Sequence, residues 1–143
     1  MSKIAIIYWS GTGNTEAMAN AVESGAKEAG AETTLFSASE FNSSKAAEFD
    51  AFAFGCPAMG AEVLEESEFD PMFTEVEGAG VLSGKKVGLF GSYGWGDGEW
   101  MRNWEERVKN AGAELVSEGV ICNESPDDEA TDSCKKLGSA LSA

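Results

Sequence analysis

The sequence predicts an open, doubly wound α/β fold, in which a five-stranded parallel sheet carries helices on both faces. Two observations indicate this architecture. Apolar runs of strand length alternate with stretches of helical period, and no linker, internal repeat or low-complexity tract interrupts them. The chain has 143 residues, which suits a single domain spanning residues 1–143. Right-handed crossovers between parallel strands limit the plausible strand orders to a few.

The first strand and the first helix have the clearest patterns. Residues Ile4–Trp9 form a continuous hydrophobic run, as expected of a central parallel strand that is covered on both faces. Apolar and small residues then recur at spacings of three and four, which predicts a helix over about Thr15–Ala29 that ends at Gly30. The buried stripe of this helix is expected to be Met18, Val22, Gly25, Ala26 and Ala29.

Four further apolar runs complete the predicted sheet. They are Thr33–Phe36, Ala51–Gly55, Lys86–Ser92 and Leu115–Ile121. Between the last two runs, one helical face is predicted from Met101, Trp104, Val108 and Ala111.

The last helix has the clearest start. Ser125 is the expected N-cap and Pro126 the first helical residue, with acidic residues following in the first turn, where the helix dipole favours negative charge. Its expected core stripe is Ala130, Cys134, Leu137 and Leu141.

The charge balance excludes several classes of partner. Lys and Arg total 10 against 25 Asp and Glu, a formal net charge of −15. Such a surface repels nucleic-acid phosphates and anionic lipid, so we expect no nucleic acid and no membrane, and basic protein partners are favoured. The absence of histidine excludes imidazole bases and imidazole metal sites.

The cysteines and the first residues point to the cytoplasm. Cys56, Cys122 and Cys134 have no CxxC spacing and cannot all pair, which is typical of reduced thiols. Near the N-terminus, polar residues and glycines break a short apolar run at once, so we expect neither a signal peptide nor a membrane span.

In folds of this class, ligands bind beyond the carboxyl ends of the strands. After the first strand comes SGTGNT, residues Ser10–Thr15, whose backbone N–H groups and hydroxyls could surround one anion at the start of a helix. The motif lacks the lysine of a Walker loop and the glycine spacing of a dinucleotide fingerprint, so ATP and NAD are not expected. The alternative is a glycine-rich turn capped by its own hydroxyls.

After the fourth strand, Trp95 lies between Gly94 and Gly96 in a stretch without helical or strand period. A tryptophan that projects from such a loop can stack on a planar ring, although it could also fold back onto the surface or into an interface. Trp100 and Trp104 lie four residues apart on the following helix and are expected to be packing residues.

After the third strand, Met59 is a soft apolar residue next to Gly60, whose backbone can change conformation at little steric cost. The acidic run that follows, Glu65–Asp70, is either a solvated face or a docking surface. Together, the three loops describe a site for a planar ring that carries a terminal phosphate.

These motifs resemble those of the short-chain flavodoxins. The resemblance runs along the whole chain through YWSGTGNTE, GCPAMGAEVLEESEF and GKKVGLFGSYGWGDGEWM, and no long insertion interrupts Leu115–Ile121. It implies the strand order 2-1-3-4-5, noncovalent FMN, and a low-potential carrier of single electrons that works as a monomer. The implied partners are redox proteins with basic docking faces, both reductases and acceptor oxidoreductases.

The resemblance also implies roles for particular residues. The phosphate would be held by side chains and backbone N–H groups of Ser10, Gly11, Thr12, Gly13, Asn14 and Thr15. Met59 would lie against the inner face of the isoalloxazine ring and Trp95 against the outer face. Glu62 would accept a hydrogen bond from ring N3–H, and Gly60 would offer its carbonyl to N5 once that nitrogen is protonated. The ring and the ribityl chain would be lined by Ala58, Ser92 and Gly94, with Asn123 as a further candidate.

Two residues depart from the flavodoxin pattern. Pro57 stands where relatives often have a hydroxyl residue near the phosphate, and Ala61 replaces a common polar or acidic residue. We expect FMN binding to survive both changes, whereas their effect on redox tuning stays open.

Other classes can be weighed on the same residues. A receiver domain needs an acceptor aspartate at the end of the third strand, where Gly55 and Cys56 stand, and a Cys-x5-Arg phosphatase needs arginine where Glu62 stands. The remaining alternative is an FMN-dependent quinone reductase on the same scaffold. That enzyme would need a nicotinamide pocket, which no motif marks.

Overall fold

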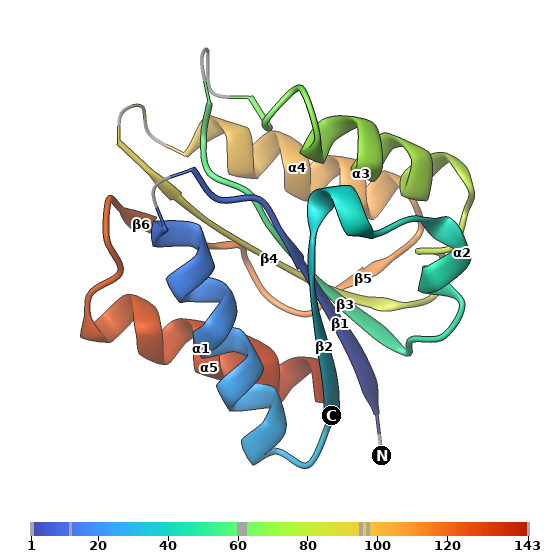
Figure 1. The fold of residues 1–143 in the computed structure, drawn as a ribbon, viewed down its shortest axis with the longest axis horizontal. Coiled ribbons are helices and arrows are strands. Elements are labelled where there is room, and N and C mark those ends of the chain that lie inside the picture. Colours follow the sequence, from blue (N-terminus) through green and yellow to red (C-terminus); the bar gives the residue numbers. More distant parts are fainter. Residues whose placement is uncertain (1, 12, 60–62, 95, 97, 143) are drawn as a thin grey trace.

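The computed structural model describes residues 2–11, 13–59, 63–94, 96 and 98–142. Six strand segments form one parallel sheet (Figure 1). They are β1 (Lys3–Tyr8), β2 (Glu32–Ser37), β3 (Ala51–Gly55), β4 (Lys86–Tyr93), β5 (Glu114–Leu115) and β6 (Val120–Asn123). The sheet runs β2-β1-β3-β4, and both β5 and β6 pair with β4 on its outer side. The order 2-1-3-4-5, which the resemblance to short-chain flavodoxins implied, is therefore confirmed.

The fifth strand consists of two segments, where the sequence predicted one run over Leu115–Ile121. The backbone N–H of Val116 still donates to the Val87 carbonyl at 3.0 Å. Beyond it, the N–H of Gly119 donates instead to a carboxylate oxygen of Glu105 at 2.7 Å. A side chain from the neighbouring helix thus supplies the acceptor, and the strand resumes at Val120.

Helices cover both faces of the sheet, as predicted (Figure 1). α1 (Asn14–Glu28) and α5 (Asp128–Ser142) pack on one face, and α3 (Phe69–Gly78) and α4 (Glu99–Asn110) on the other. A short 3₁₀ turn, η1 (Ala38–Glu40), and the short helix α2 (Ser43–Ala46) lie between β2 and β3. Neither η1, α2 nor α3 was predicted from the sequence.

Strand β1 explains why both layers are needed. Ile4 and Ile6 point into the core beneath α1 and α5, while Ala5 and Ile7 point into the core beneath α3 and α4, and all four are fully buried. This alternation matches the continuous apolar run, because a central parallel strand has no solvent-facing side. Trp104 is also buried, against Phe69 and Phe73, with ring centroids 5.3 and 5.8 Å away, so its predicted packing role is confirmed.

The backbones of α1 and α5 approach each other closely at two glycines. A Cβ atom on Gly25 would lie 2.0 Å from the carbonyl oxygen of Lys135. A Cβ atom on Gly138 would lie 2.1 Å from the carbonyl oxygen of Val22. No side chain larger than hydrogen fits at either position unless the helices separate.

The start of α5 corrects two predictions. Neither Ser125 as N-cap nor Pro126 as the first helical residue is right, because the helix begins at Asp128 and the carboxylate of Asp127 accepts the N–H of Ala130 at 2.8 Å. This is the geometry of an N-cap side chain. At the other end of the chain, α1 ends as predicted, with Gly30 at a positive φ of 92° just beyond it.

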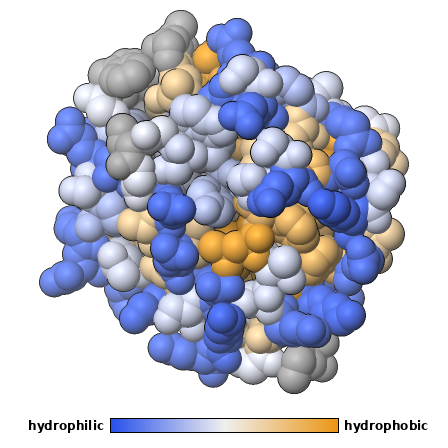
Figure 2. Space-filling model, in the orientation of Figure 1, coloured by the Kyte–Doolittle hydropathy of each residue, from blue (hydrophilic) through white to orange (hydrophobic). Residues whose placement is uncertain are grey.

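Hydrophilic residues cover most of the face shown in Figure 2, with apolar residues gathered near its middle. This agrees with the net charge of −15. Within the described ranges, none of the helices combines the length and the apolar composition needed to cross a membrane.

Candidate functional site

The segments that follow β1, β3, β4 and β6 meet at the carboxyl edge of the sheet (Figure 1). They enclose a cleft of about 320 Å³. Its lining consists of Trp9, Gly11, Pro57, Ala58, Met59, Ser92, Tyr93, Gly94 and Glu124. The described part of this lining is mainly apolar and contains no lysine or arginine.

The loop after β1 is arranged around an oxygen acceptor. The Ser10 hydroxyl accepts the backbone N–H of Gly13 at 3.0 Å and that of Glu16 at 3.3 Å. Gly13 stands at the N-cap of α1 with a φ of 94°, a conformation that costs glycine little. The first N–H groups of α1 are therefore directed at one small volume, where the helix dipole favours an anion.

Two of the predicted hydroxyl residues meet below this loop. Thr15 is buried in the first turn of α1, and its hydroxyl lies 3.4 Å from the hydroxyl of Ser92 on β4. Asn14 is the first residue of α1. Backbone N–H groups and neutral hydroxyls form a donor set that suits a phosphate monoester, so these residues fit the phosphate end of the expected cofactor.

In the loop after β3, two backbone hydrogen bonds join Met59 to Val63. The N–H of Met59 donates to the Val63 carbonyl, and the N–H of Val63 donates to the Met59 carbonyl, each at 2.9 Å. Residues 59 and 63 are thus held side by side. Because the Met59 carbonyl is already bonded, turning the peptide that follows it would break one hydrogen bond. Met59 lies in the cleft lining, and the apolar and aromatic side chains around it suit a flat ring.

Several predicted site residues lie outside the described residues. These are Thr12, Gly60, Glu62 and Trp95, together with Ala61. Among the remaining candidates, Gly11, Ala58, Met59, Ser92 and Gly94 line the cleft. The N–H of Ala58 donates to the Ser92 carbonyl at 3.1 Å, which joins the loop after β3 to the end of β4.

Three residues of the cleft lining were missed in the sequence. The sequence predicts Trp9 only as the end of the first strand, Tyr93 ends β4, and Glu124 follows β6. The Tyr93 carbonyl accepts the N–H of Glu124 at 2.8 Å, which brings Glu124, rather than the predicted Asn123, into the lining. The position of each residue at the carboxyl end of a strand was the signal that could have found them.

The acidic run after β3 is only partly a surface. Glu65 is 6% exposed, and its carboxylate accepts the N–H groups of Ser67, Glu68 and Phe69 at 2.9, 2.7 and 2.9 Å, as well as the Ser67 hydroxyl. The interpretation of this residue as part of a solvated face is therefore wrong. Burial by itself would raise the pKa of Glu65, but these hydrogen bonds outweigh it and lower the pKa below its ordinary value.

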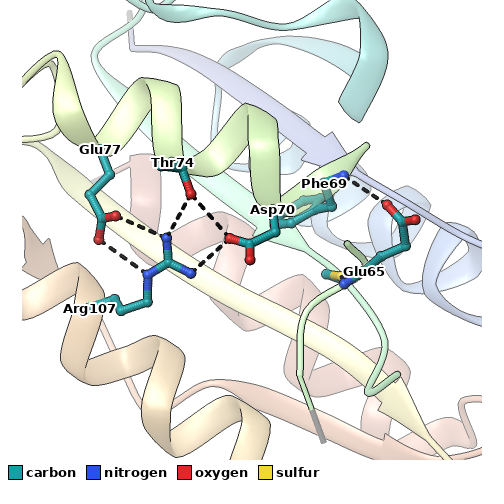
Figure 3. Close-up of polar contacts among 7 residues, drawn as sticks. Glu65, Phe69, Asp70, Thr74, Glu77 and Arg107 are labelled. Carbon is teal, nitrogen blue, oxygen red and sulfur yellow. Dashed lines mark hydrogen bonds and ion pairs between the residues drawn. The ribbon is translucent and has the colours of Figure 1, made fainter. Parts of the chain in front are cut away.

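Asp70 belongs to a clamp between α3 and α4 (Figure 3). The guanidinium of Arg107 lies 3.0 Å from a carboxylate oxygen of Asp70 and 2.9 Å from one of Glu77. It also lies over the ring of Phe73, 4.9 Å from its centroid. The Asp70 and Glu77 charges are thus partly neutralised within the protein, which leaves less of this run for docking.

All three thiols are free and buried. Burial raises the pKa of Cys56 and of Cys122, and it raises the pKa of Cys134 to about 12. The Cys56 sulfur accepts the N–H of Glu65 at 3.3 Å. Among the residues that the structure describes, no three Cys, Asp or Glu side chains cluster as metal ligands would.

Comparison with known proteins gives a consistent result. The family model described as flavodoxin matches residues 6–138. The flavodoxin of Megasphaera elsdenii is 49% identical over 137 residues, covering 96% of each chain. The flavodoxin of Clostridium beijerinckii is 46% identical over 136 residues, covering 95% of this chain and 96% of that one. The solution structure of two-electron-reduced M. elsdenii flavodoxin superimposes with a TM-score of 0.88 at 48% identity, over 97% of this chain and 98% of that one.

Proposed function

Because this chain belongs to the flavodoxin family, and so is an FMN-binding electron carrier rather than an enzyme, we propose that the cleft at the carboxyl edge of its sheet binds FMN. FMN supplies the one-electron chemistry when it is bound. The polypeptide binds it, orients it and limits its contact with water. An FMN-dependent quinone reductase is not supported, because the relatives that match nearly full length are flavodoxins.

At the phosphate end, the supporting observation is the Ser10 hydroxyl, which accepts two N–H groups at the start of α1. A phosphate oxygen can take the same position and accept the same donors. The proposed phosphate ligands are Ser10, Gly11, Thr12, Gly13, Asn14 and Thr15. All their side-chain and backbone donors are neutral, so phosphate binding depends on hydrogen bonds and the helix dipole.

At the ring end, the apolar lining supports a position for the isoalloxazine. Met59 and the main chain of Ala58 would contact the ring from the loop after β3, and Ser92 and Gly94 from the end of β4. Gly60, Glu62 and Trp95 are proposed here from the resemblance alone.

Carboxylates near the ring would lower the potential at which it accepts electrons. Glu124 lies in the cleft lining, and the whole chain carries a net charge of −15. One carboxylate at roughly 10 Å, with an effective dielectric of about 20, disfavours an added negative charge by about 1.7 kcal/mol, or about 70 mV for one electron. The absence of a basic residue from the described lining leaves this effect unopposed.

The same net charge supports redox partners with basic docking faces, as reductases and acceptor oxidoreductases would supply. A charge of this size also opposes self-association, in agreement with a monomer. The three unpaired thiols support a cytoplasmic location.

Binding measurements with FMN and riboflavin test the site, because riboflavin lacks only the phosphate. We expect Ser10→Ala to weaken FMN binding by about tenfold or more and to leave riboflavin binding unchanged, since a charge-assisted hydrogen bond is lost. Ser117→Ala, outside the cleft, serves as control. Equal loss of affinity for both flavins would refute the phosphate assignment.

A further inference from the structure

Trp9 packs against the loop after β1. Its backbone N–H donates to the Gly55 carbonyl at 3.0 Å, which fixes the residue at the end of β1. A Cβ atom on Gly11 would lie 3.1 Å from Cη2 of the indole, so the backbone of Gly11 rests almost directly on this ring. The position of the indole therefore sets the position of the loop at Gly11, and both residues line the cleft.

The opposite side of the same indole is held by Glu68. Its carboxylate oxygen Oε1 accepts the indole Nε1–H at 3.2 Å. Glu68 lies 59 positions further along the chain, in the turn that leads into α3, so this contact joins the loop after β1 to the segment after β3.

The turn that carries Glu68 is itself anchored to the sheet. The buried Glu65 carboxylate accepts the N–H of Glu68 at 2.7 Å, and the N–H of Glu65 donates to the sulfur of Cys56, just beyond β3, at 3.3 Å. Contacts thus run without interruption from the end of β3 through Glu65 and Glu68 to Trp9 and Gly11. A carboxylate on a mobile loop would place the indole less firmly.

We propose that Glu68 is a positioning residue for the phosphate end of the cleft, acting through Trp9 on the loop after β1. This inference rests on the proposed FMN site. Glu68 is not part of the described cleft lining; its hydrogen bond holds the indole against the backbone of Gly11, which is. The contact should therefore favour FMN over riboflavin, and its loss should leave the affinity for the ring itself unchanged.

The charge of Glu68 has to be separated from its hydrogen bond, because the negative charge alone repels a phosphate. Glu68→Gln and Glu68→Ala both remove the charge, but only glutamine keeps an oxygen that can accept the indole N–H. Any difference between these two variants therefore reports the contact with Trp9. Glu68 is exposed, so neither change disturbs the core.

The dissociation constants of FMN and riboflavin are measured for both variants by calorimetric titration of the apoprotein. We expect Glu68→Ala to bind FMN about threefold to tenfold more weakly than Glu68→Gln, the effect of one exposed hydrogen bond. Their riboflavin affinities should agree within about twofold. Equal FMN affinities, or an equal difference for both flavins, would overturn the proposal.

A second pair of variants tests the route through the indole. Trp9→Phe keeps a ring beside Gly11 but has no N–H to donate. In this background, Glu68→Ala and Glu68→Gln should bind FMN equally well, and a persisting difference would show that Glu68 acts by another route. Failure of the proposed site is visible separately, since the wild-type protein would then bind FMN no more tightly than riboflavin.

Discussion

Glu65 offers the sharpest test of how the segment after β3 is built. Glu65→Ala removes the carboxylate that accepts three backbone N–H groups in the turn leading into α3. One of these, the N–H group of Phe69, is buried. Loss of an ordinary hydrogen bond costs about 1 kcal/mol, and an unsatisfied buried N–H costs about 1–3 kcal/mol. We therefore expect the free energy of unfolding to fall by about 3 kcal/mol. Glu65→Gln keeps one acceptor oxygen and should cost about 1 kcal/mol.

The Glu65 carboxylate also predicts a dependence on pH. Its pKa is lowered in the folded protein, whereas in the unfolded chain it is about 4.3. The charged carboxylate therefore contributes its full stabilisation above about pH 5, and this contribution is lost as the pH falls through the lower, folded-state pKa. The difference in stability between wild type and Glu65→Gln should be constant near neutral pH and should shrink in acid.

Urea unfolding of the FMN-loaded protein, followed by far-ultraviolet circular dichroism at pH 7 and at several lower pH values, measures both effects. Glu66→Ala is the matched control, because this exposed neighbour makes no hydrogen bond or ion pair with any residue that the structure describes. The reasoning is refuted if Glu65→Ala costs no more than Glu66→Ala. It is equally refuted if the cost of Glu65→Gln is the same in acid as at pH 7.

Three further predictions concern helix packing and charge. Gly138→Ala should destabilise the fold by about 1–3 kcal/mol, because the added Cβ would lie 2.1 Å from the Val22 carbonyl oxygen. Gly78→Ala should instead stabilise the fold by up to about 1 kcal/mol, because its Cβ would meet nothing within 4 Å. Urea unfolding of the two variants measures both changes in the free energy of unfolding. Arg107→Lys should lower the free energy of unfolding by about 1 kcal/mol, because lysine cannot bridge Asp70 and Glu77 in the same way, and unchanged stability in the same assay would contradict the clamp. With a net charge of −15, electron transfer to a basic protein should slow as salt rises, and stopped-flow rates that ignore ionic strength would contradict the docking argument.

The strands and the long helices α1, α4 and α5 could be predicted because their signals are local. The run from Ile4, for example, is apolar throughout, as burial on both faces requires. Helix α3 was not predicted, because it begins at Phe69, within the acidic run Glu65–Asp70, where the sequence shows no helical pattern of apolar residues. Nothing local distinguishes Glu65, whose carboxylate is buried by the turn it stabilises, from the exposed Glu66 beside it.

The remaining errors came from contacts between distant residues. The fifth strand is interrupted where the Glu105 carboxylate, from α4, accepts the N–H of Gly119. Neither the helical pattern around Glu105 nor the apolar run around Gly119 indicates this contact. The apolar run predicts Trp9 as a strand end, whereas its hydrogen bond to Glu68, 59 positions away, forms only when the fold brings the loops after β1 and β3 together. The phosphate loop is the opposite case, since Ser10 and Gly13 lie three residues apart and their contact is local.

The buried thiols leave this chain with few side chains that gain or lose protons near neutral pH. The chain has no histidine, and burial raises the pKa of Cys56, Cys122 and Cys134. Apart from the α-amino group, the polypeptide thus lacks the groups that commonly exchange protons just above neutral pH. A proton taken up near pH 7 when a bound flavin is reduced would therefore involve no imidazole and no thiol of this chain. An indicator dye in weakly buffered solution would follow the protonation of the cofactor almost without background from the protein.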